Sequence, residues 1–501
     1  MITKRLNEEN LASISESIPV PEYERSGLST GIVHVGVGNF HRSHEAFYTD
    51  QLLGMGEKEW GICGICLLDR DLKMYNTLAD QDGLYSLIVK HSDGYQEVRI
   101  IGSIVEYLYA PSDPDAVITA MADPGVKIIS LTITEGGYNF DPSTGQFLFS
   151  KADIQWDLQY PDQPKTIFGY LTAGFALRKH NALPGLSVLS CDNMQKNGDV
   201  CKQMVMTYIR EAKPDLAVWV EEHVSFPNSM VDRITPVSSQ EEIEELKKEF
   251  QIEDAWPVVC EPFVQWIIED DFAQGRPPWE KVGVQFVDEV EPYEKMKIRL
   301  LNAGHSLLGF IGSLFAYSTI DECIRDPEIT GFLSAFMDQE VSPLLGSLEG
   351  IDLDGYKQSL IQRFANPYIG DQLTRICSES SSKIPKFLLP GIEEQLKRGG
   401  PVKLSALVLA TWCRYLEVAG SAGYDYEVQD AMKEELVEKA KASMNADPLA
   451  FLKIQTIFGQ LSHSGPFIET YLPLIDSLRK HGPAECIKDV LKANRSPGQR
   501  I

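Results

Sequence analysis

The chain has 501 residues, of which 43% are hydrophobic, so it is long enough for two or three domains of about 150 residues with ordinary cores. Its formal net charge of −26 at pH 7 would repel nucleic acid and anionic membrane surfaces, and we expect neither as a partner. Any anionic ligand must then be held by a local cluster of positive charge.

The chain carries no recognisable targeting or membrane segment. Residues 1–19 are polar, without the apolar core of a secretory signal, and no run of about 18 apolar residues predicts a membrane span. Nine scattered cysteines, an odd number, indicate free thiols in a reducing compartment. Cys63 and Cys66 lie in one apolar run without a second pair, so no zinc site is expected. These features predict a cytoplasmic protein, and cores of this size predict a monomer.

The first part of the chain alternates strand-like and helical patterns. Strands are predicted at 32–37, 60–68, 84–90, 97–103, 127–133 and 186–191, and helices at 45–53, 116–121 and 168–180. This alternation predicts an α/β domain with a mostly parallel, doubly wound sheet. Beyond about residue 290 the pattern becomes helical, at 294–315, 327–341, 354–364, 404–417, 426–445 and 484–493. We therefore expect an α/β domain at 1–288 and a mainly helical domain at 289–501.

A short glycine motif follows the first predicted strand and precedes a predicted helix: Gly36-Val37-Gly38. Glycines at such a turn let the backbone approach a pyrophosphate, whose charge the helix N-terminus favours. The third glycine of the full dinucleotide motif is absent, because His41 stands in its place. The strand before and the helix after still predict dinucleotide binding, with Arg42 as an added charge for a phosphate.

An acidic residue at the end of the second strand is expected to bind the adenosine ribose. Asp69 stands there, and its distance from Gly38 requires a longer connection than the usual ~20 residues. A carboxylate at this place would accept hydrogen bonds from ribose hydroxyls and repel a 2′-phosphate, so it predicts NAD over NADP. Arg70 beside it could instead accommodate the phosphate. Asp71 is an alternative for the acid, and a solvated turn is the structural alternative.

The segment Glu291–Ser306 has the pattern of a helix that carries unusual polar residues. On a 3.6-residue period, four of them fall within an arc of roughly 140°: Glu294, Lys297, Asn302 and His305. The residues around them are apolar enough to be buried, and buried polar side chains are costly unless they satisfy one another or a ligand. We therefore expect a site on this helix; the alternative is a solvated helix face.

Two other patterns are weaker. Tyr293 and Lys297 have the Tyr-x-x-x-Lys spacing of short-chain dehydrogenases, but the pair lies about 255 residues after the glycine motif, which is too far for one compact domain. His41 and His44 have the spacing of metal ligands without a third ligand nearby, so packing or hydrogen bonding is expected and no metal site is predicted. His34 lies within a strand and is expected to be a satisfied core histidine.

The chain resembles the polyol-specific long-chain dehydrogenases, the mannitol dehydrogenase family, over nearly its whole length. The motifs that carry the resemblance are Gly36-x-Gly38-x-Phe40-His41-Arg42-x-His44, Thr132-x-Thr134-Glu135-x-Gly137-Tyr138, Cys191-Asp192-Asn193, Phe226-Pro-Asn-Ser-Met-Val-Asp232-Arg233 and Lys297-x-x-x-x-Asn302-x-x-His305. The resemblance implies a Rossmann-type N-terminal domain and a mainly α-helical C-terminal domain, with the active site in the cleft between them. It also implies metal-free hydride transfer between NAD and C2 of an open-chain polyol or ketose, with D-mannitol and D-fructose as the favoured pair.

The resemblance implies roles for individual residues as well. Lys297 is the expected general acid/base, and His305 is expected to orient the substrate. Asn193 and Asn302 are the expected pair that binds the reacting oxygen. The expected substrate contacts are Asp232, Arg375 and Lys383. The expected cofactor contacts are Gly36, Val37, Gly38, Asn39, Phe40, His41, Arg42, Asp69, Thr134 and Glu135.

These residue types suit the chemistry of alcohol oxidation, which removes a hydride from carbon and a proton from oxygen. A lysine with its ordinary pKa near ~10.4 is protonated at neutral pH, but burial and the positive charge of oxidised nicotinamide both lower that pKa. Lys297 can thus be tuned to accept the proton. Two amide N–H donors would stabilise negative charge on the oxygen. Glu294, one turn before Lys297, could relay the proton to water.

Other functions fit parts of the same pattern. A fructuronate or tagaturonate reductase would need an unpaired cation for the substrate carboxylate, for which Arg375 and Lys383 leave room. A sugar-phosphate dehydrogenase would need a denser cationic cluster and is usually a shorter chain. A dinucleotide sensor without turnover would have no need of Lys297, Asn302 and His305. Among the polyol dehydrogenases, mannitol, arabinitol and sorbitol remain open as substrates.

Overall fold

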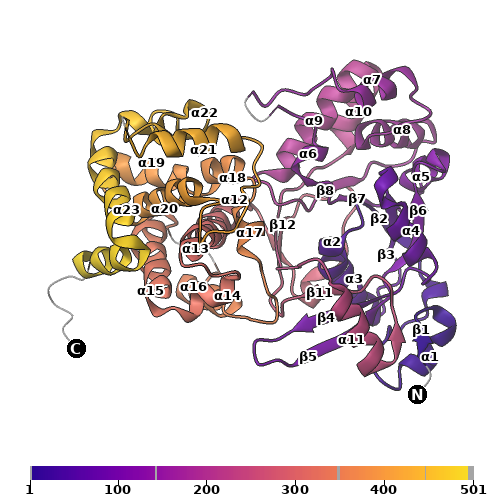
Figure 1. Cartoon of the computed structure of the whole chain (residues 1–501). Coiled ribbons are helices and arrows are strands. Elements are labelled where there is room, and N and C mark those ends of the chain that lie inside the picture. Colours follow the sequence, from indigo (N-terminus) through magenta and orange to yellow (C-terminus); the bar gives the residue numbers. More distant parts are fainter. Residues whose placement is uncertain (1–2, 142–143, 347–349, 446, 495–501) are drawn as a thin grey trace. The chain divides into compact units, whose positions relative to one another are not determined.

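The computed structural model describes residues 3–141, 144–346, 350–445 and 447–494 (Figure 1). The chain divides into two compact units, Met1–Glu291 and Pro292–Ile501. The first unit combines helices with strands, and the second is mainly helical. Among the described residues, no helix has both the length and the apolar character needed to cross a membrane.

The first unit is built on a parallel sheet of five strands in the order β6-β3-β2-β7-β8. Its strands are β2 (Thr30–Val35), β3 (Gly61–Cys66), β6 (Ile104–Tyr109), β7 (Ile128–Leu131) and β8 (Ser187–Ser190). The chain starts in the middle at β2, moves outward through β3 and β6, and then crosses to β7 and β8 on the other side. This is the order of a doubly wound, Rossmann-type sheet, so the predicted α/β class is confirmed. The strand order reverses between β2 and β7, where such sheets bind their ligands.

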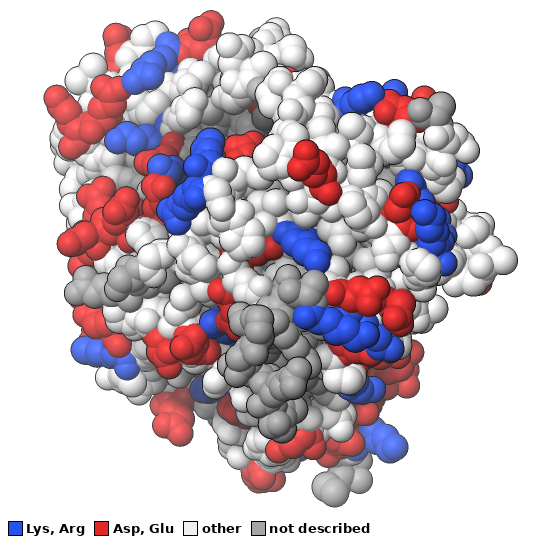
Figure 2. All heavy atoms as spheres, turned by 90° about the vertical axis from the view of Figure 1, so that its left-hand side faces the viewer, with Lys and Arg blue, Asp and Glu red and all other residues white. Residues whose placement is uncertain are grey.

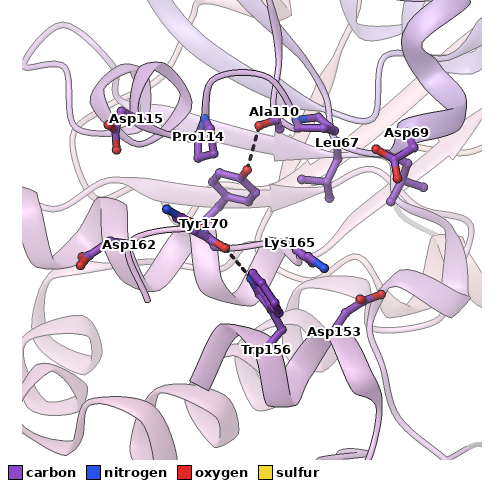
Figure 3. A pocket seen from close by; sticks show the side chains of 14 residues that line it. Leu67, Asp69, Ala110, Pro114, Asp115, Asp153, Trp156, Asp162, Lys165 and Tyr170 are labelled. Carbon is purple, nitrogen blue, oxygen red and sulfur yellow. Dashed lines mark hydrogen bonds between the residues drawn. The ribbon is translucent and has the colours of Figure 1, made fainter. Parts of the chain in front are cut away.

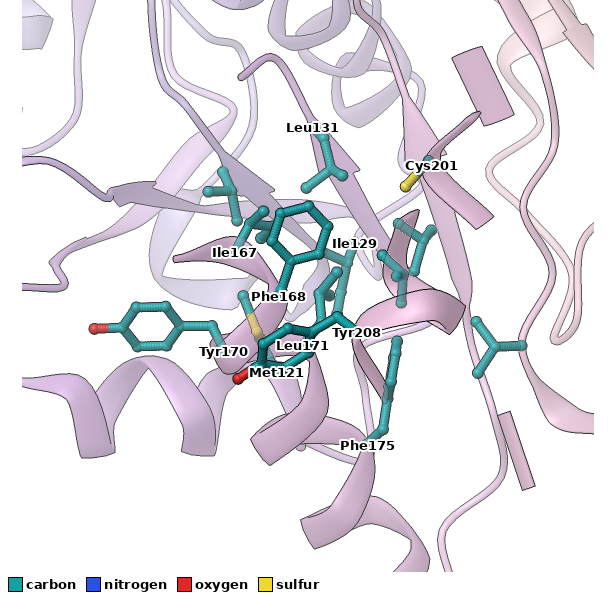
Figure 4. Packing of buried hydrophobic residues seen from close by; sticks show 14 of the residues in the cluster. Met121, Ile129, Leu131, Ile167, Phe168, Tyr170, Leu171, Phe175, Cys201 and Tyr208 are labelled. Atoms are coloured by element: carbon teal, nitrogen blue, oxygen red, sulfur yellow. The ribbon is translucent and has the colours of Figure 1, made fainter. Parts of the chain in front are cut away.

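Helices cover both faces of this sheet because its strands carry apolar side chains on both sides. Val33 and Leu131 point to one face, and Ile32 and Ile128 point to the other. Figure 4 shows the first face, where sheet residues meet buried aromatic side chains. The helices packed there are α5 (Pro114–Met121), α8 (Ile167–His180) and α9 (Asn197–Ala212). The second face packs against α3 (Glu45–Gly54) and two buried tryptophans, Trp266 and Trp279.

Smaller sheets complete the first unit. The strands predicted at 84–90 and 97–103 are confirmed as β4 (Tyr85–Lys90) and β5 (Gln96–Ile101), which pair antiparallel. Between residue 191 and the boundary near residue 288, where no strand is predicted, several short strands form: β9 (Ser229–Asp232), β10 (Ile252–Glu253), β11 (Val258–Cys260), β12 (Gln265–Glu269) and β13 (Gln285–Val287). They were missed because segments of two to five residues carry too little periodicity to detect. The other elements are β1 (Lys4–Arg5), α1 (Leu11–Ile14), α2 (Asn39–Ser43), α4 (Leu72–Ala79), α6 (Thr134–Gly137), α7 (Ala152–Gln159), α10 (Pro214–His223) and α11 (Gln240–Phe250).

The helical pattern of the C-terminal part is also confirmed. Its elements are α12 (Glu291–Lys297), η5 (Ile298–Asn302), α13 (Ala303–Leu314), α14 (Ile320–Arg325), α15 (Pro327–Phe336), η6 (Met337–Val341), α16 (Leu353–Phe364), α17 (Leu373–Cys377), α18 (Ser380–Phe387), α19 (Leu389–Arg398), α20 (Lys403–Val418), α21 (Lys433–Ala442), α22 (Gln455–Phe458) and α23 (Gly465–Asn494). Helix α20 is buried along most of its length, and Trp412 on it stacks against Phe310 of α13.

On the face drawn in Figure 2, the basic side chains of the described residues lie among acidic ones rather than in one continuous patch.

Three helices differ from the sequence-based expectation. The helix predicted at 426–445 begins only at Lys433, because the preceding segment is held by hydrogen bonds from Ser381 to Asp430 and from Glu379 to the Gln429 carbonyl. The helices predicted at 294–315 and 327–341 each contain a π-helical turn, η5 and η6. A π turn inserts one residue into a helix without a change of composition, and such turns are frequent at functional sites.

Candidate active site

A cavity of about 580 Å³ opens at the carboxyl ends of the central strands. Its walls come from the segments that follow three of those strands, namely 36–38 after β2, 67–74 after β3 and 132–139 after β7, together with 151–154 and 165–168. This is the switch point of the sheet, where dinucleotides bind in doubly wound folds. Arg70, Lys151 and Lys165 line the cavity and provide the local positive charge that an anionic ligand of this acidic chain requires.

The glycine motif forms one wall of this cavity. Gly36 has φ of +96°, and a Cβ on it would lie 2.2 Å from the carbonyl oxygen of Thr132. Only glycine can therefore occupy this position. Gly38 precedes α2, which has just five residues and ends at a break in the backbone at His44. Because so short a helix has a weak dipole, the N–H groups of the loop are the main donors available to a pyrophosphate.

The residues after the glycine motif turn into the protein. Arg42 is completely buried, and its guanidinium donates to the carbonyl of Trp256 at 2.5 Å and to Oδ1 of Asn39 at 2.8 Å. Burial lowers the pKa of Arg42. Phe40 stacks on the ring of His44, with centroids 4.8 Å apart. The charge expected to meet a phosphate thus lies against the protein interior, and no local sequence pattern indicates this because Trp256 is remote in the chain.

His41 belongs to the one cluster of metal-ligand types found among the described residues, with His34 and Glu45. All three are buried, and the rings of His34 and His41 stack 3.4 Å apart at an interplanar angle of 9°. The ring-nitrogen lone pairs of parallel imidazoles lie in their ring planes, so they run side by side and do not converge on one ion. Burial lowers the pKa of His41 well below its ordinary value, so its ring is neutral. The stacked rings fit a packing role for His41, whose ring nitrogens have no hydrogen-bond partner among the described residues, whereas His34 contacts Ser130 and Thr132.

The acidic residues after β3 have different surroundings. Asp71 accepts a hydrogen bond from the Leu68 backbone N–H at 3.0 Å, so its carboxylate caps the turn. Asp69 is exposed and lines a second cavity, of about 670 Å³, that shares Leu67, Leu68, Asp153 and Lys165 with the first. Figure 3 shows this second cavity, whose rim carries the carboxylates Asp69, Asp115, Asp153 and Asp162. The four carboxylates outnumber Lys165, which lines the same cavity, and so disfavour an added phosphate by like-charge repulsion.

Asp192 organises the segment after β7. Its carboxylate accepts hydrogen bonds from the backbone N–H groups of Ile133 at 3.1 Å and Thr134 at 2.8 Å, and from the hydroxyl of Tyr138 at 2.7 Å. Burial raises the pKa of Asp192. Asn193 follows it and is exposed, and Glu135 is exposed on α6. Asp192 lies within one of the family motifs, but the sequence predicts no role for it, and only its place beside Asn193 draws attention to it.

Asp232 is the last residue of β9 and is buried. The adjacent Arg233 donates to the backbone carbonyls of Ser43 at 2.5 Å and Glu261 at 3.1 Å, and it lies over the ring of Phe47. Arg233 therefore ties together segments of the first unit.

The second unit presents its candidate residues on the α12–η5–α13 segment. Lys297 and Asn302 are each 7% exposed, and the half-buried His305 ring packs 4.6 Å from that of Phe364. The N–H of Ala303 donates to the carbonyl of Ile298, five residues back, which defines the π turn η5 between them. In a regular α-helix Lys297 and Asn302 would be roughly 140° apart, and the extra residue in the turn brings them closer to a common face.

Arg375 and Lys383 lie on neighbouring helices of the second unit. Arg375 forms two hydrogen bonds with Asp371, at 2.7 and 2.6 Å, and the rest of its side chain is exposed. Nζ of Lys383 donates to the Ile376 carbonyl at 3.2 Å, at the C-terminal end of α17. Burial, and secondly the charge of Arg375, lower the pKa of Lys383. Both cations therefore have protein partners.

Comparison with known proteins agrees with this architecture. The mannitol dehydrogenase Rossmann domain matches residues 30–281, and the mannitol dehydrogenase C-terminal domain matches residues 289–476. Mannitol 2-dehydrogenase of Phaeosphaeria nodorum is 43% identical over 96% of this chain and 84% of its own length, and that of Aspergillus fumigatus is 43% identical over 96% and 98%.

Two solved structures share both the fold and the sequence. The Pseudomonas fluorescens mannitol 2-dehydrogenase, solved as a ternary complex with NAD and D-mannitol, has a TM-score of 0.86 and 42% identity, covering 98% of this chain and 100% of that one. A substrate-free D-sorbitol dehydrogenase has a TM-score of 0.89 and 37% identity, covering 96% and 100%. The family models and these relatives thus define a polyol dehydrogenase with a Rossmann-type dinucleotide domain. The chain belongs to the mannitol dehydrogenase family.

Proposed function

We propose that this NAD-dependent dehydrogenase interconverts D-mannitol and D-fructose by metal-free hydride transfer at C2. The observation that carries the proposal is the intact set Lys297, Asn302 and His305 on one rigid segment, in a chain 43% identical to mannitol 2-dehydrogenases. NAD, bound in the 580 Å³ cavity at the glycine motif, supplies the hydride acceptor or donor.

Lys297 is the general acid/base of this mechanism. It accepts the C2 hydroxyl proton when the polyol is oxidised and returns a proton when the ketose is reduced. Its burial, at 7% exposure, disfavours the ammonium form, and the charge of oxidised nicotinamide adds to this effect. Glu294, also buried and one turn away, is the candidate to pass the proton onward.

Asn193 and Asn302 donate to the reacting oxygen, where negative charge builds up as the C–O bond changes order. The π turn that follows Lys297 supports this assignment, because it turns Asn302 toward the face of the helix that carries the lysine. His305 orients the substrate, with its ring held against Phe364. Asp232, Arg375 and Lys383 contact the other hydroxyl groups, and a polyol suits both carboxylate acceptors and cationic donors.

The cofactor preference follows from Asp69 and from the other carboxylates that line the same cavity. Asp69 accepts from the ribose hydroxyls of NAD and repels the 2′-phosphate of NADP, with Asp115, Asp153 and Asp162 adding to the repulsion. Arg70 lines the cofactor cavity itself and contributes to binding of the pyrophosphate.

The deciding experiment measures NADH oxidation by the full chain with D-fructose, for the native protein and the Lys297→Ala variant. We expect rapid native turnover and a loss of about 10²–10⁴-fold in the variant, with NADH affinity near normal. Lys295→Ala is the matched control, since Lys295 lies on the same helix but pairs with Glu394 at 3.6 Å. Full activity of Lys297→Ala would refute the mechanism. Turnover of fructuronate but not fructose would move the protein to the sugar-acid reductases, and faster oxidation of sorbitol or arabinitol would change the favoured polyol.

A further inference from the structure

The carbonyl of Gly36, at the start of the cofactor loop, is held by a series of hydrogen-bonded polar side chains, of which Thr132 is half-buried and the others are buried. Oγ1 of Thr132 donates to this carbonyl at 2.7 Å, and the same oxygen lies 2.9 Å from Nε2 of His34. His34 stands opposite Ser130 in the pairing of β2 with β7, and Thr132 lies two residues further on the same side. The segment after β7 therefore reaches the glycine loop through side chains that the strand register brings together.

The hydrogen positions on these side chains can be assigned from the donors and acceptors that each of them contacts. A threonine hydroxyl has one hydrogen and a carbonyl oxygen can only accept, so the hydrogen of Thr132 lies toward Gly36. The contact between Thr132 and Nε2 of His34 then requires a hydrogen on that nitrogen. His34 is thus a donor at Nε2, and its ring is either the Nε2–H tautomer or the imidazolium.

The other ring nitrogen faces Glu45. Nδ1 of His34 lies 2.8 Å from Oγ of Ser130 and 3.1 Å from Oε2 of Glu45, and Ser130 donates to that same carboxylate oxygen at 2.9 Å. The hydrogen of Ser130 lies toward Glu45, so it cannot serve the contact between Nδ1 of His34 and Oε2 of Glu45. That contact needs a second proton, carried either by Nδ1 or by Oε2. The His34–Glu45 pair therefore shares one proton, and its members are 0% and 1% exposed.

We propose that His34 is a positioning residue for the cofactor, acting through Thr132 on the Gly36 peptide, with Glu45 keeping His34 in the donor state. A trans peptide directs its carbonyl and its N–H to opposite sides. Fixing the Gly36 carbonyl against Thr132 therefore fixes the direction of the Val37 N–H, a donor of the loop that lines the cofactor cavity. Beside this Glu45–His34–Thr132 relay, the ring of His41 stacks on that of His34 and so covers one face of it, with Nε2 of His41 3.7 Å from Oε2 of Glu45.

The test compares two substitutions at Thr132. Thr132→Val keeps the shape of the side chain and removes the hydroxyl, whereas Thr132→Ser keeps the hydroxyl. We expect NADH binding, followed by fluorescence titration of the full chain, to weaken about 10-fold in Thr132→Val and about twofold or less in Thr132→Ser. The KM for NAD should rise in the valine variant while kcat changes little. Equal weakening in both variants, or none in the valine variant, would overturn the relay.

A second pair tests His34 directly. His34→Gln supplies an amide N–H to Thr132 and should bind NADH more tightly than His34→Met, which has no donor; equal affinities would overturn the assignment of His34. The inference rests on the proposed binding of NAD at this loop, but not on the choice of polyol. If no polyol or ketose is turned over while the NADH titrations behave as expected, the relay stands and the proposed function fails.

Discussion

The carboxylate of Asp192 accepts the backbone N–H of Thr134 at 2.8 Å, and Thr134 at that point has φ of +62°. A β-branched residue in the left-handed region is an outlier, because its Cβ approaches the neighbouring peptide groups. Such strain persists only where surrounding contacts fix it, and it gathers at ligand sites. Both conditions hold here, since Thr134 lines the cofactor cavity and Asp192 also binds Ile133 and Tyr138.

Asp192→Asn should weaken this segment. The amide keeps one acceptor oxygen, but its NH₂ group replaces the second one. The N–H or O–H donors that faced that second oxygen then lack a partner, which costs about 1–3 kcal/mol. We expect a thermal midpoint several degrees lower and NADH affinity reduced about 10-fold. Tyr138→Phe is the matched control, because it removes one of the three donors and leaves the two backbone bonds. A loss in Asp192→Asn no larger than in Tyr138→Phe would contradict the role of the carboxylate.

Thr134→Gly should stabilise the fold. Glycine relieves the left-handed strain of about 1–2 kcal/mol and loses part of that gain to the greater freedom of the unfolded chain. The net expected gain is about 0.5–1 kcal/mol in urea unfolding, measured against Thr134→Ala, which removes the exposed side chain and keeps the backbone strain. An alanine variant as stable as the glycine variant would show that the conformation of Thr134 is not strained.

Asp69→Ala should reduce the preference for NAD over NADP about 10-fold in kcat/KM, because it removes a negative charge near the expected position of the 2′-phosphate. Asp71→Ala is the comparison, because Asp71 lines the cofactor cavity and is the alternative acid, while its carboxylate also caps the Leu68 N–H. Its loss should cost about 0.5–2 kcal/mol of stability and, with Asp69 as the selector, change the cofactor ratio less. Equal cofactor ratios in native protein and Asp69→Ala would remove Asp69 as the selector.

The Rossmann-type sheet and the glycine loop could be predicted from the sequence because their signals are local. Strand periodicity, a Gly-x-Gly after a strand and an apolar helix with interleaved polar residues all act within about 20 residues. At Gly36 the residue type alone predicts a backbone position that excludes a side chain. The structure shows why, since a Cβ there would collide with the carbonyl of Thr132.

The orientation of Arg42, the π turn at η5 and the contact of His34 with the cofactor loop could not be predicted from the sequence. They depend on residues remote in the sequence or on one extra residue in a helical turn. The sequence suggests Arg42 as a phosphate ligand, but its direction is set by Trp256 and Tyr85. The π turn at η5 adds a residue to a turn without any change in apolar pattern. His34 fulfils the expectation of a satisfied core histidine, but its link to the cofactor loop needs Thr132, which directly follows a strand that comes about 100 residues later in the chain.

A buried carboxylate in the second unit gives the protein a pH-dependent stability that lies outside the candidate site. Glu340 accepts hydrogen bonds from the N–H groups of Leu404 and Ser405, at 2.7 and 2.8 Å, and so caps the start of α20. Burial raises the pKa of Glu340 from 4.5 to about 7. Between these values the unfolded chain releases the proton and the folded chain keeps it.

Glu340 therefore makes the fold less stable as the pH rises from 4.5 to about 7, by on the order of 3 kcal/mol, and has no further effect above that range. Glu340→Gln does not titrate at this position. Its stability relative to the native protein should therefore increase as the pH rises from 4.5 to about 7, whatever the difference in stability between the two proteins at pH 4.5. Urea unfolding at several pH values measures the difference, with the exposed Glu435→Gln as control. A constant difference between native and Glu340→Gln proteins from pH 4.5 to 8 would show that the carboxyl is ionised throughout, held so by the two N–H donors of α20.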